Sequence, residues 1–426
     1  MNYKISVGVQ LSDKRTSAYL PFLVYFLMYF SNDTYMFGSN RSELMQAIPR
    51  YLLLIFCVVE FFLIVPKFSR VWKVFVPSIA MASGIIISSL IINNDSFSRV
   101  VIKLICLFAA LFFVCRFKFN IFAESYNKAI YLICVPAIIF ELLLYVFPSL
   151  FYLLPQIINT AGHHYSTFIF AGVNTNNAGS LFIRSSGIFW EPGAFQVFIN
   201  LAIFFELFAL EKVNRKRLTI YYLALLFTFS TTGYIACFWL LLGYILFDRN
   251  NISKRNKIIS IIVVSVLLVL FIVFPDTPLG NIVFGKLSDL STGTTMVRFA
   301  GIVVNLIILK DNILFGIGMD KMPDVFLATS LIPSVRNFLG GFTHQNTNTL
   351  LYQYSAFGLF YGTLFTVGWF HFGKNISSSF WLRIWIFSFL FILFISENFM
   401  VSIWPFVLVF YGYLSCDKKN YLEGLS

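Results

Sequence analysis

The stretch AIYLICVPAIIFELLLYVF, residues 129–147, decides the fold class of this chain. It carries one charged side chain, Glu141, and about 20 apolar residues are enough for a helix to cross the hydrocarbon core of a bilayer. Arg116, Lys118 and Lys128 stand before it, and the long segment 148–192 follows it. The stretch therefore predicts a membrane-spanning helix that begins beside a basic loop.

The composition extends this prediction to the whole chain. Of its 426 residues, 58% are hydrophobic and 12% are charged, whereas about 25% are charged in a typical soluble domain. A water-soluble fold cannot bury so much apolar surface, so most soluble enzyme classes are excluded. We expect an all-α fold in which residues 1–426 form a single integral membrane domain, a polytopic transmembrane helical bundle.

Twelve apolar runs can be drawn along the chain, which predicts about twelve spanning helices. The segment before the first run, MNYKISVGVQLSDKR, is too polar for a signal peptide. The runs cover residues 18–36, 48–65, 74–92, 100–114, 129–147, 193–210, 218–230, 233–247, 258–274, 347–370, 380–396 and 398–415.

The basic residues predict the orientation of these runs. With both termini in the cytoplasm, every inside loop is short and basic, as in 212–217 and 249–257, and together these loops hold most of the 31 Lys and Arg. This is the positive-inside pattern, so the net charge of +12 indicates a membrane rather than a nucleic-acid partner. Two long segments, 148–192 and 275–346, then form periplasmic loops.

The second long loop contains a shorter apolar segment. Residues 296–309 are apolar apart from Arg298 and Asn305, which is short for a span. Counting this segment as a span would invert the charge pattern of all later loops. We therefore expect an interfacial or re-entrant helix that lies over the bundle, and short interfacial helices in both long loops.

The six cysteines show no CxxC spacing and lie in or beside apolar runs. Neither a disulfide framework nor a zinc site is therefore expected. His163 and His164 are adjacent, which points their side chains in different directions, and no acidic cluster lies near them in the sequence. We expect no metal site there.

Few basic residues fall on the periplasmic side, and several of them stand beside unusual local sequence. They are Arg41, Arg50, Arg99, Lys103, Arg184, Lys286, Arg298, Lys310, Lys321 and Arg336.

The stretch RSSGIFWEPGAF, residues 184–195, joins the first long loop to the sixth run. Pro192 suits the first position of a helix, and Glu191 then meets the positive end of the helix dipole. One interpretation is a helix start with a stabilising acid. The other is a site at the membrane surface, in which Arg184 binds phosphate bidentately and Glu191 orients or deprotonates a hydroxyl.

Two further polar segments admit two interpretations each. Residues 230–233, STTG, form either a polar hairpin turn or a place where the hydroxyls of Thr231 and Thr232 line a sugar site. Arg298 begins an otherwise apolar helix, where a cation either snorkels to solvent or lipid phosphate or binds an anion. The nearby Gly316-Ile-Gly318 lacks the setting of a nucleotide loop.

The segment THQNTN, residues 343–348, precedes the tenth run. Thr343 can cap that helix. His344 can serve as a general base or as a donor to a developing phosphate charge, although a lone histidine is more often a satisfied polar residue.

Acidic residues inside the runs test a rival hypothesis, a proton-coupled transporter. Glu60 and Glu206 fall near the cytoplasmic ends, where we expect them to reach water, and Glu141 and Glu397 fall toward the outer ends. None sits at mid-membrane with a basic partner, where transporters place such residues.

Taken together, these motifs resemble the O-antigen polymerase (Wzy-type) and O-antigen ligase superfamily of bacterial inner-membrane proteins. The resemblance rests on residues 184–195, on the STTG turn, on VRFA…LFGIGMD (297–320), and on HQN (344–346) before a span with Gly358 and Gly362. It covers about 180 to 370 by motif and the remainder by topology. HQN departs from an adjacent His-Asn pair, which puts the roles of His344 and Asn346 in doubt.

The resemblance implies a fold and a chemistry. The fold is a helical bundle of the lipid-sugar-using glycosyltransferase (GT-C-like) type. The substrate is an undecaprenyl-pyrophosphate-linked oligosaccharide, and neither metal nor other cofactor is used. The polymerase transfers the growing glycan to a new repeat unit at the outer leaflet, and a chain-length regulator protein is a further candidate partner.

The same chemistry assigns roles to candidate residues. Arg184 and Arg298 are expected to stabilise the departing pyrophosphate, with Arg336 in reserve and Lys321 as a further substrate-binding residue. Glu191 and His344 are the candidate bases, and the sequence does not rank them. Asn346, Thr231 and Thr232 are expected to bind substrate.

Two alternatives stay open. A ligase shares the donor chemistry but transfers the polymer to lipid A-core. A flippase or other transporter is expected to show repeated halves and charges along a central path, and no internal repeat stands out here.

Overall fold

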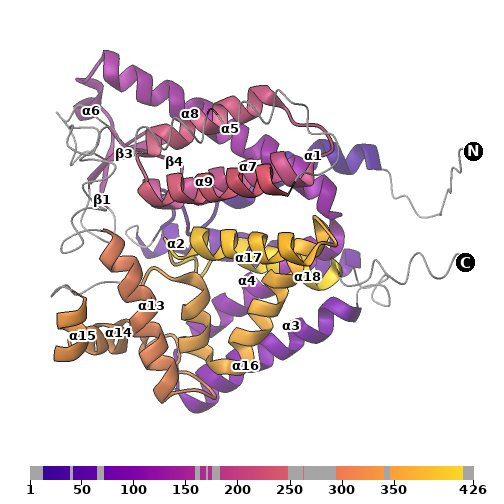
Figure 1. Cartoon of the computed structure of the whole chain (residues 1–426), viewed down its shortest axis with the longest axis vertical. Helices are drawn as coiled ribbons and strands as arrows, with labels where there is room; N and C mark the ends of the chain where they lie inside the picture. The colour runs from indigo at the N-terminus through magenta and orange to yellow at the C-terminus, as the bar shows by residue number, and fades with distance from the viewer. Residues whose placement is uncertain are drawn as a thin grey trace, which may run out of the picture.

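A computed structural model describes residues 13–38, 42–64, 72–158, 164–168, 171–174, 183–247, 262, 294–339 and 346–415. Over these residues the chain is mostly helical (Figure 1). The helices are α1 (Asp13–Tyr29), α2 (Glu43–Ile64), α3 (Trp72–Ile85), η2 (Ile86–Ile92), α4 (Phe97–Arg116), α5 (Phe119–Val146), α6 (Leu150–Leu153), α7 (Pro192–Phe204), η4 (Phe205–Ala209), α8 (Arg215–Thr228), α9 (Thr231–Leu246), α13 (Thr294–Asp311), α14 (Met322–Ser330), α15 (Pro333–Phe338), α16 (Thr349–Phe372), η5 (Gly373–Asn375), α17 (Phe380–Phe394) and α18 (Trp404–Leu414).

The first long loop holds a small antiparallel sheet. Its strands follow one another in the order β1 (Gln156–Ile158), β2 (His164–Phe168), β3 (Ala171–Asn174) and β4 (Ser185–Gly187). The prediction of an all-α fold missed this sheet, because short strands leave little pattern in a loop of mixed polarity. The short helix α6 and the helices α13, α14 and α15 occupy the long loops as expected.

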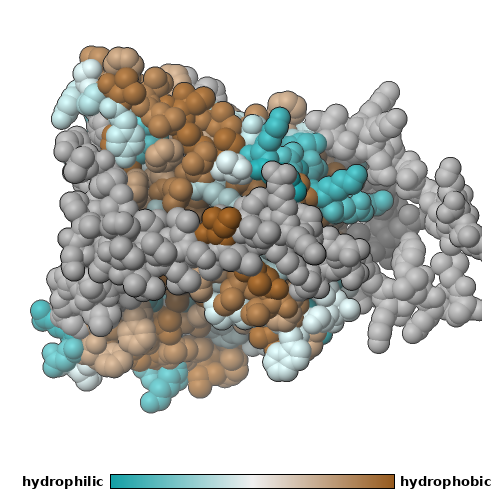
Figure 2. Space-filling model, turned by 45° about the horizontal axis from the view of Figure 1, so that its top comes forward, coloured by the Kyte–Doolittle hydropathy of each residue, from teal (hydrophilic) through white to brown (hydrophobic). Residues whose placement is uncertain are grey.

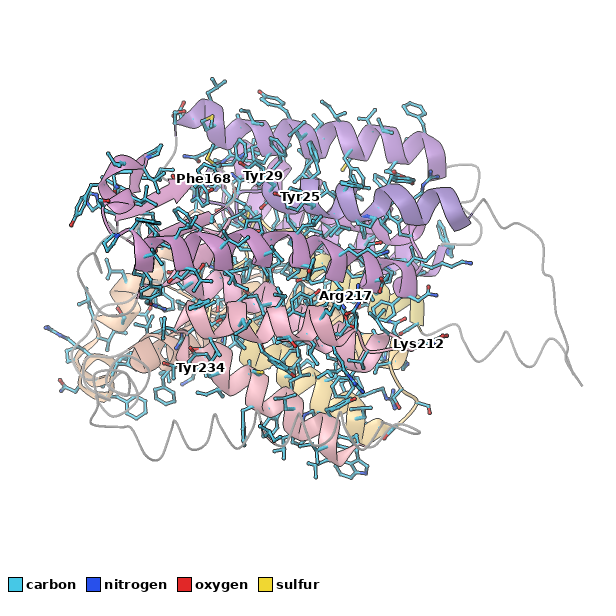
Figure 3. All side chains as sticks on the ribbon, turned by 90° about the horizontal axis from the view of Figure 1, so that it is seen from above. Tyr25, Tyr29, Phe168, Lys212, Arg217 and Tyr234 are labelled. Carbon is cyan, nitrogen blue, oxygen red and sulfur yellow. The ribbon has the colours of Figure 1, made fainter. Side chains whose placement is uncertain are left out.

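The helices run between two ends of the bundle. At one end Tyr19 of α1 packs its ring on Phe117, whose carbonyl accepts a hydrogen bond of 2.9 Å from Tyr411 of α18. At the other end the amide of Tyr35, after α1, donates to Ile188, after β4, at 3.2 Å. We call the first the basic end and the second the sheet end. Figure 3 places Lys212 and Arg217 toward the former and Phe168 and Tyr234 toward the latter.

Among the described residues, length and composition identify five helices that can cross a membrane: residues 43–62, 74–92, 97–116, 119–146 and 192–209. The other predicted runs on described residues also contain helices, although run 18–36 is helical only to Tyr29 and run 398–415 only from Trp404. Of run 258–274 the structure describes only Ile262. The outward face of α2 exposes Ile55, Val59 and Phe62. In Figure 2 apolar residues make up much of the coloured surface on the face shown, and hydrophilic residues gather in separate patches. Long apolar helices with exposed apolar side chains are compatible with a protein embedded in a lipid bilayer.

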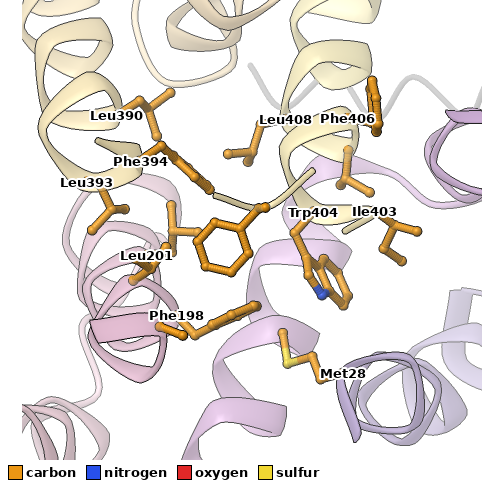
Figure 4. Close-up of a cluster of buried hydrophobic side chains, with 14 of the residues drawn as sticks. Met28, Phe198, Leu201, Leu390, Leu393, Phe394, Ile403, Trp404, Phe406 and Leu408 are labelled. Carbon is orange, nitrogen blue, oxygen red and sulfur yellow. The ribbon is translucent and has the colours of Figure 1, made fainter. Parts of the chain in front are cut away.

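A dense apolar core joins α1, α7, α17 and α18 (Figure 4). Phe198 and Trp404 are almost fully buried there. The ring of Phe399, in the α17–α18 connection, lies 5.7 Å edge-on to Phe198 and 5.6 Å from Phe394. Because lipid tails are as apolar as these side chains, close packing rather than escape from water holds such helices together. The α17–α18 connection is therefore held against the bundle.

A break divides α16 at Gly358. This residue has φ of +83° and ψ of 178°, and a segment after α13 fills the gap. The amides of Ile317 and Gly318 each donate to α16 carbonyls at 3.0 Å, and the amide of Leu359 donates to Ile313 at 2.7 Å. The GxG pattern thus repairs the backbone of a broken helix, in the way that buried non-helical segments are tolerated in membranes.

Acidic side chains at the basic end form ion pairs with arginines. Arg217 contacts Glu124 at 3.0 Å and Glu206 at 3.3 Å, and Arg116 lies 3.6 Å from Glu60. Glu206 has no exposed surface. The expectation that Glu60 and Glu206 reach water was therefore wrong, since tertiary packing supplies arginines instead.

Candidate functional site

The RSSGIFWEPGAF segment folds as a strand, a tight turn and a helix start. Arg184 directly precedes β4, and Gly187 turns the chain with φ of +54°. A Cβ on Gly187 would lie 2.9 Å from the ring of Phe195, so both the backbone conformation and the space require glycine. The helix then begins at Pro192, as predicted.

Glu191 stands immediately before α7. Its carbonyl accepts the amides of Ala194 and Phe195 at 3.1 Å, but its carboxylate caps no amide of the helix. The carboxylate instead accepts a bond of 3.2 Å from the indole of Trp190. Helix capping therefore does not explain the acid, although the positive end of the helix dipole still favours its charge.

Arg184 is half-buried between the sheet and the α8–α9 turn. Its Nε donates to the carbonyl of Thr228 at 3.2 Å. Burial lowers the pKa of Arg184, and Tyr165, Glu191, Tyr234 and Glu397 raise it in turn. One nitrogen of the guanidinium is thus used for positioning, and two acids lie within electrostatic reach.

Arg298 reaches the same place from α13. It is half-buried, and its Nε has no hydrogen-bond partner among the described residues. Burial lowers the pKa of Arg298, and the charge of Arg184 lowers it further, whereas Glu397 and Glu191 raise it. Arg184 and Arg298, far apart in the sequence, therefore lie within electrostatic reach of the same two acids, an arrangement that favours an anionic ligand.

Glu397 completes the cluster from the α17–α18 connection. Its side chain is buried, with 7% of its surface exposed. A Cβ on Gly193 would lie 2.1 Å from Oε1 of Glu397 and 3.7 Å from Oε1 of Glu191. Both carboxyl groups therefore share the notch that Gly193 leaves in the first turn of α7.

These surroundings shift the pKa of Glu397. Burial raises the pKa of Glu397 well above its usual range, and the charge of Glu191 and a hydrogen bond with its carboxylate raise it further. Arg298 and Arg184 act in the opposite direction. Two carboxyl groups that share a site can both ionise only at a cost in free energy.

Several buried polar contacts hold the segment that carries Glu397. Lys103 donates to the carbonyl of Met400 at 2.7 Å, and its ammonium lies 4.8 Å from the ring centroid of Phe406. Gln196 of α7 donates to Ser396 at 3.0 Å. Lys103, one of the few basic residues on the predicted outer side, is thus used to position this segment.

The STTG turn lies beside the cluster but presents little of its side chains. Ser230 caps α9 through the amide of Gly233 at 3.4 Å. Thr231 and Thr232 form the first turn of α9 and are buried. The residue that links this part of the chain to the site is Thr228, just before the turn. Its carbonyl accepts a hydrogen bond from Arg184.

The other predicted binding residues lie elsewhere. Asn346 and Asn305 exchange two hydrogen bonds of 3.0 Å, so the amide of Asn346 joins the start of α16 to α13. Lys321 and Arg336 are exposed, at the start of α14 and on α15. None of these three is among the groups that act on Arg184, Arg298 or Glu397.

His344 and His163 lie outside the described residues. Within the described ranges, no three His, Cys, Asp or Glu side chains gather in a way that could hold a metal ion. Among the cysteines that the structure describes, Cys57, Cys106, Cys115, Cys134 and Cys237 are free thiols.

Glu397 is a residue of the site that the sequence pattern did not place there. The signal was Ser-Glu-Asn, residues 396–398, between two strongly apolar runs. Gln196 and Asn200, one turn apart on α7, are fully buried and bond to each other. Such polar residues within an apolar helix mark a polar interior.

No protein-family model and no curated protein matches this chain.

Proposed function

We propose that the chain is an O-antigen polymerase of the Wzy type. It joins undecaprenyl-pyrophosphate-linked repeat units at the outer face of the bacterial inner membrane and releases undecaprenyl pyrophosphate. The observation that carries the proposal is that Arg184 and Arg298, from separate long loops, both lie within electrostatic reach of Glu191 and Glu397, whose carboxyl groups share the notch at Gly193. The motif resemblance to the polymerase and ligase superfamily supports it.

The proposed reaction needs no metal. The acceptor hydroxyl gives its proton to a base, for which Glu191 and His344 are the candidates. Its oxygen attacks the anomeric carbon, and the bond from that carbon to the pyrophosphate oxygen breaks. The electron pair stays on the pyrophosphate, where two guanidinium groups stabilise the developing charge. A single in-line displacement inverts the anomeric centre.

The proposed architecture is a GT-C-like bundle of about twelve spans with both termini in the cytoplasm. The basic end, with Arg116, Lys118 and the 212–217 segment, then faces the cytoplasm in agreement with the positive-inside rule. The sheet end, with the arginine pair, faces the periplasm. A bulky lipid-linked glycan would meet the site where bilayer and water join.

The deciding experiment is reconstitution of the purified protein in lipid vesicles with purified lipid-linked repeat units. We expect polymer to form without added metal ion or nucleotide. A preparation that is inserted and monodisperse but makes no polymer under these conditions refutes the proposal.

Loss of the gene separates the polymerase from its nearest rival. A polymerase-deficient cell is expected to display lipopolysaccharide with core plus one repeat unit. Bare core with accumulated lipid-linked polymer would instead identify a ligase.

A further inference from the structure

The Glu191–Glu397 pair has a consequence for the base of the proposed reaction. We infer that Glu397 carries a proton and donates it in a hydrogen bond to the Glu191 carboxylate, which fixes Glu191 toward the acceptor hydroxyl. Glu397 is then a positioning residue, and Glu191 is the group that touches substrate. This inference rests on the proposed function.

The geometry supports a shared proton. Both Oε1 atoms lie close to the same point above Gly193, at 2.1 and 3.7 Å. An ionised carboxylate only accepts hydrogen bonds, so two carboxyl groups can bond to each other only if one is protonated. Glu397 is the more buried of the two, and burial disfavours its charged form.

The charged groups around Glu397 come from three separate elements. Among the described residues they are Glu191 before α7, Arg184 before β4 and Arg298 on α13. With Glu397 neutral, two positive charges face one negative charge. The cluster therefore keeps a net positive charge that attracts a pyrophosphate. If Glu397 were ionised, its negative charge would cancel that net charge.

The neutral partner also keeps Glu191 available. Glu191 is drawn electrostatically toward both arginines, and a full ion pair would occupy the donors that the pyrophosphate needs. The hydrogen bond from Glu397 and the indole bond of Trp190, at 3.2 Å, hold the carboxylate on the side of α7. During transfer Glu191 accepts the hydroxyl proton, and it releases that proton to water after the product leaves.

The test compares Glu397→Gln with Glu397→Ala in the reconstituted polymerase. Glutamine is neutral at every pH and keeps a donor for Glu191, so we expect kcat within about threefold of the parent protein. Alanine removes a hydrogen bond to a charged group, so kcat should fall about 10- to 100-fold with little change in KM. Equal inactivity of both variants, beside an active parent protein, would overturn the inference and leave the proposed function standing.

The pH profile gives a readout that a purely structural role would not move. The raised pKa of Glu397 means that it ionises only as the pH rises, which removes its donor and adds a repelling charge. The activity of the parent protein should therefore fall on the alkaline side, and in Glu397→Gln that fall should move to higher pH or vanish. An unchanged alkaline limb contradicts the inference.

Infrared spectroscopy tests the proton without any activity. The purified parent protein at neutral pH should show the carbonyl stretch of a protonated carboxyl group that Glu397→Gln lacks. Glu141→Gln is the matched control, because Glu141 is also buried but is not among the groups that act on Glu397. This substitution should leave the Glu397 band and the polymer yield unchanged. Absence of a Glu397 band refutes the inference even if the protein proves not to be a polymerase.

Discussion

At the scale of single residues, Arg184 and Arg298 have the clearest expected effects. Replacing either by alanine removes a donor aimed at the leaving pyrophosphate, so kcat in the polymer assay should fall about 10²- to 10³-fold. Lysine should also impair transfer, because a point charge does not reproduce a planar fork. Lys310→Ala, at an exposed position on the same helix as Arg298, is the control. Full chain-length ladders from both alanine variants would refute the proposed site.

Gly193 links the start of α7 to Glu397. A Cβ there would sit 2.1 Å from Oε1 of Glu397, so Gly193→Ala should push this carboxyl out of its notch. We expect polymer yield to fall at least tenfold, while the intrinsic helix propensity improves by about 1 kcal/mol. In Gly84→Ala the nearest contact is an ordinary 3.4 Å, so that variant should behave like the parent protein. Full activity in Gly193→Ala would show that the notch has no part in function.

At the scale of elements, the break in α16 is the most constrained feature. Gly358 occupies a backbone region that is essentially reserved for glycine, and a Cβ would lie 2.1 Å from the carbonyl of Leu314. Gly358→Ala should therefore destabilise the protein by on the order of 1–3 kcal/mol or more. Thermal unfolding in detergent measures this, again beside Gly84→Ala. Equal stability of the two variants would mean that the break is dispensable.

The elements at the sheet end also explain how distant loops form one site. The amide of Tyr35 bonds to Ile188, Arg184 bonds to the end of α8, and Thr349 of α16 bonds to the carbonyl of Glu397. Each contact joins segments that are remote in the sequence. The arginines and carboxyl groups are therefore placed by the bundle and not by a local motif.

At the scale of the whole molecule, the orientation in the membrane is open to direct test. Tyr152, on α6, is 77% exposed at the sheet end, and Lys216 is exposed at the basic end. An impermeant maleimide should label Tyr152→Cys from the periplasm of intact spheroplasts and Lys216→Cys only after lysis. The reverse labelling pattern would place Arg184 and Arg298 on the cytosolic side. That result would refute the proposed reaction, which takes place at the periplasmic face.

The sequence alone determined the membrane character, most of the helical runs and the start of α7 at Pro192. These properties depend on local composition and spacing, because a backbone in lipid must satisfy its own hydrogen bonds and so forms helices wherever an apolar run is long enough. Arg184, Glu191 and Arg298 could likewise be selected, since polar residues beside apolar runs are costly unless they are used.

Only the tertiary structure decided which of these residues meet. It added the four-stranded sheet, placed Glu397 against Glu191, paired Glu206 with Arg217 and left Lys321 and Arg336 exposed. Proximity between remote segments depends on how helices pack, and the packing of side chains leaves no periodic trace in one sequence. The proton that Glu397 holds is likewise a property of its neighbours and not of its residue type.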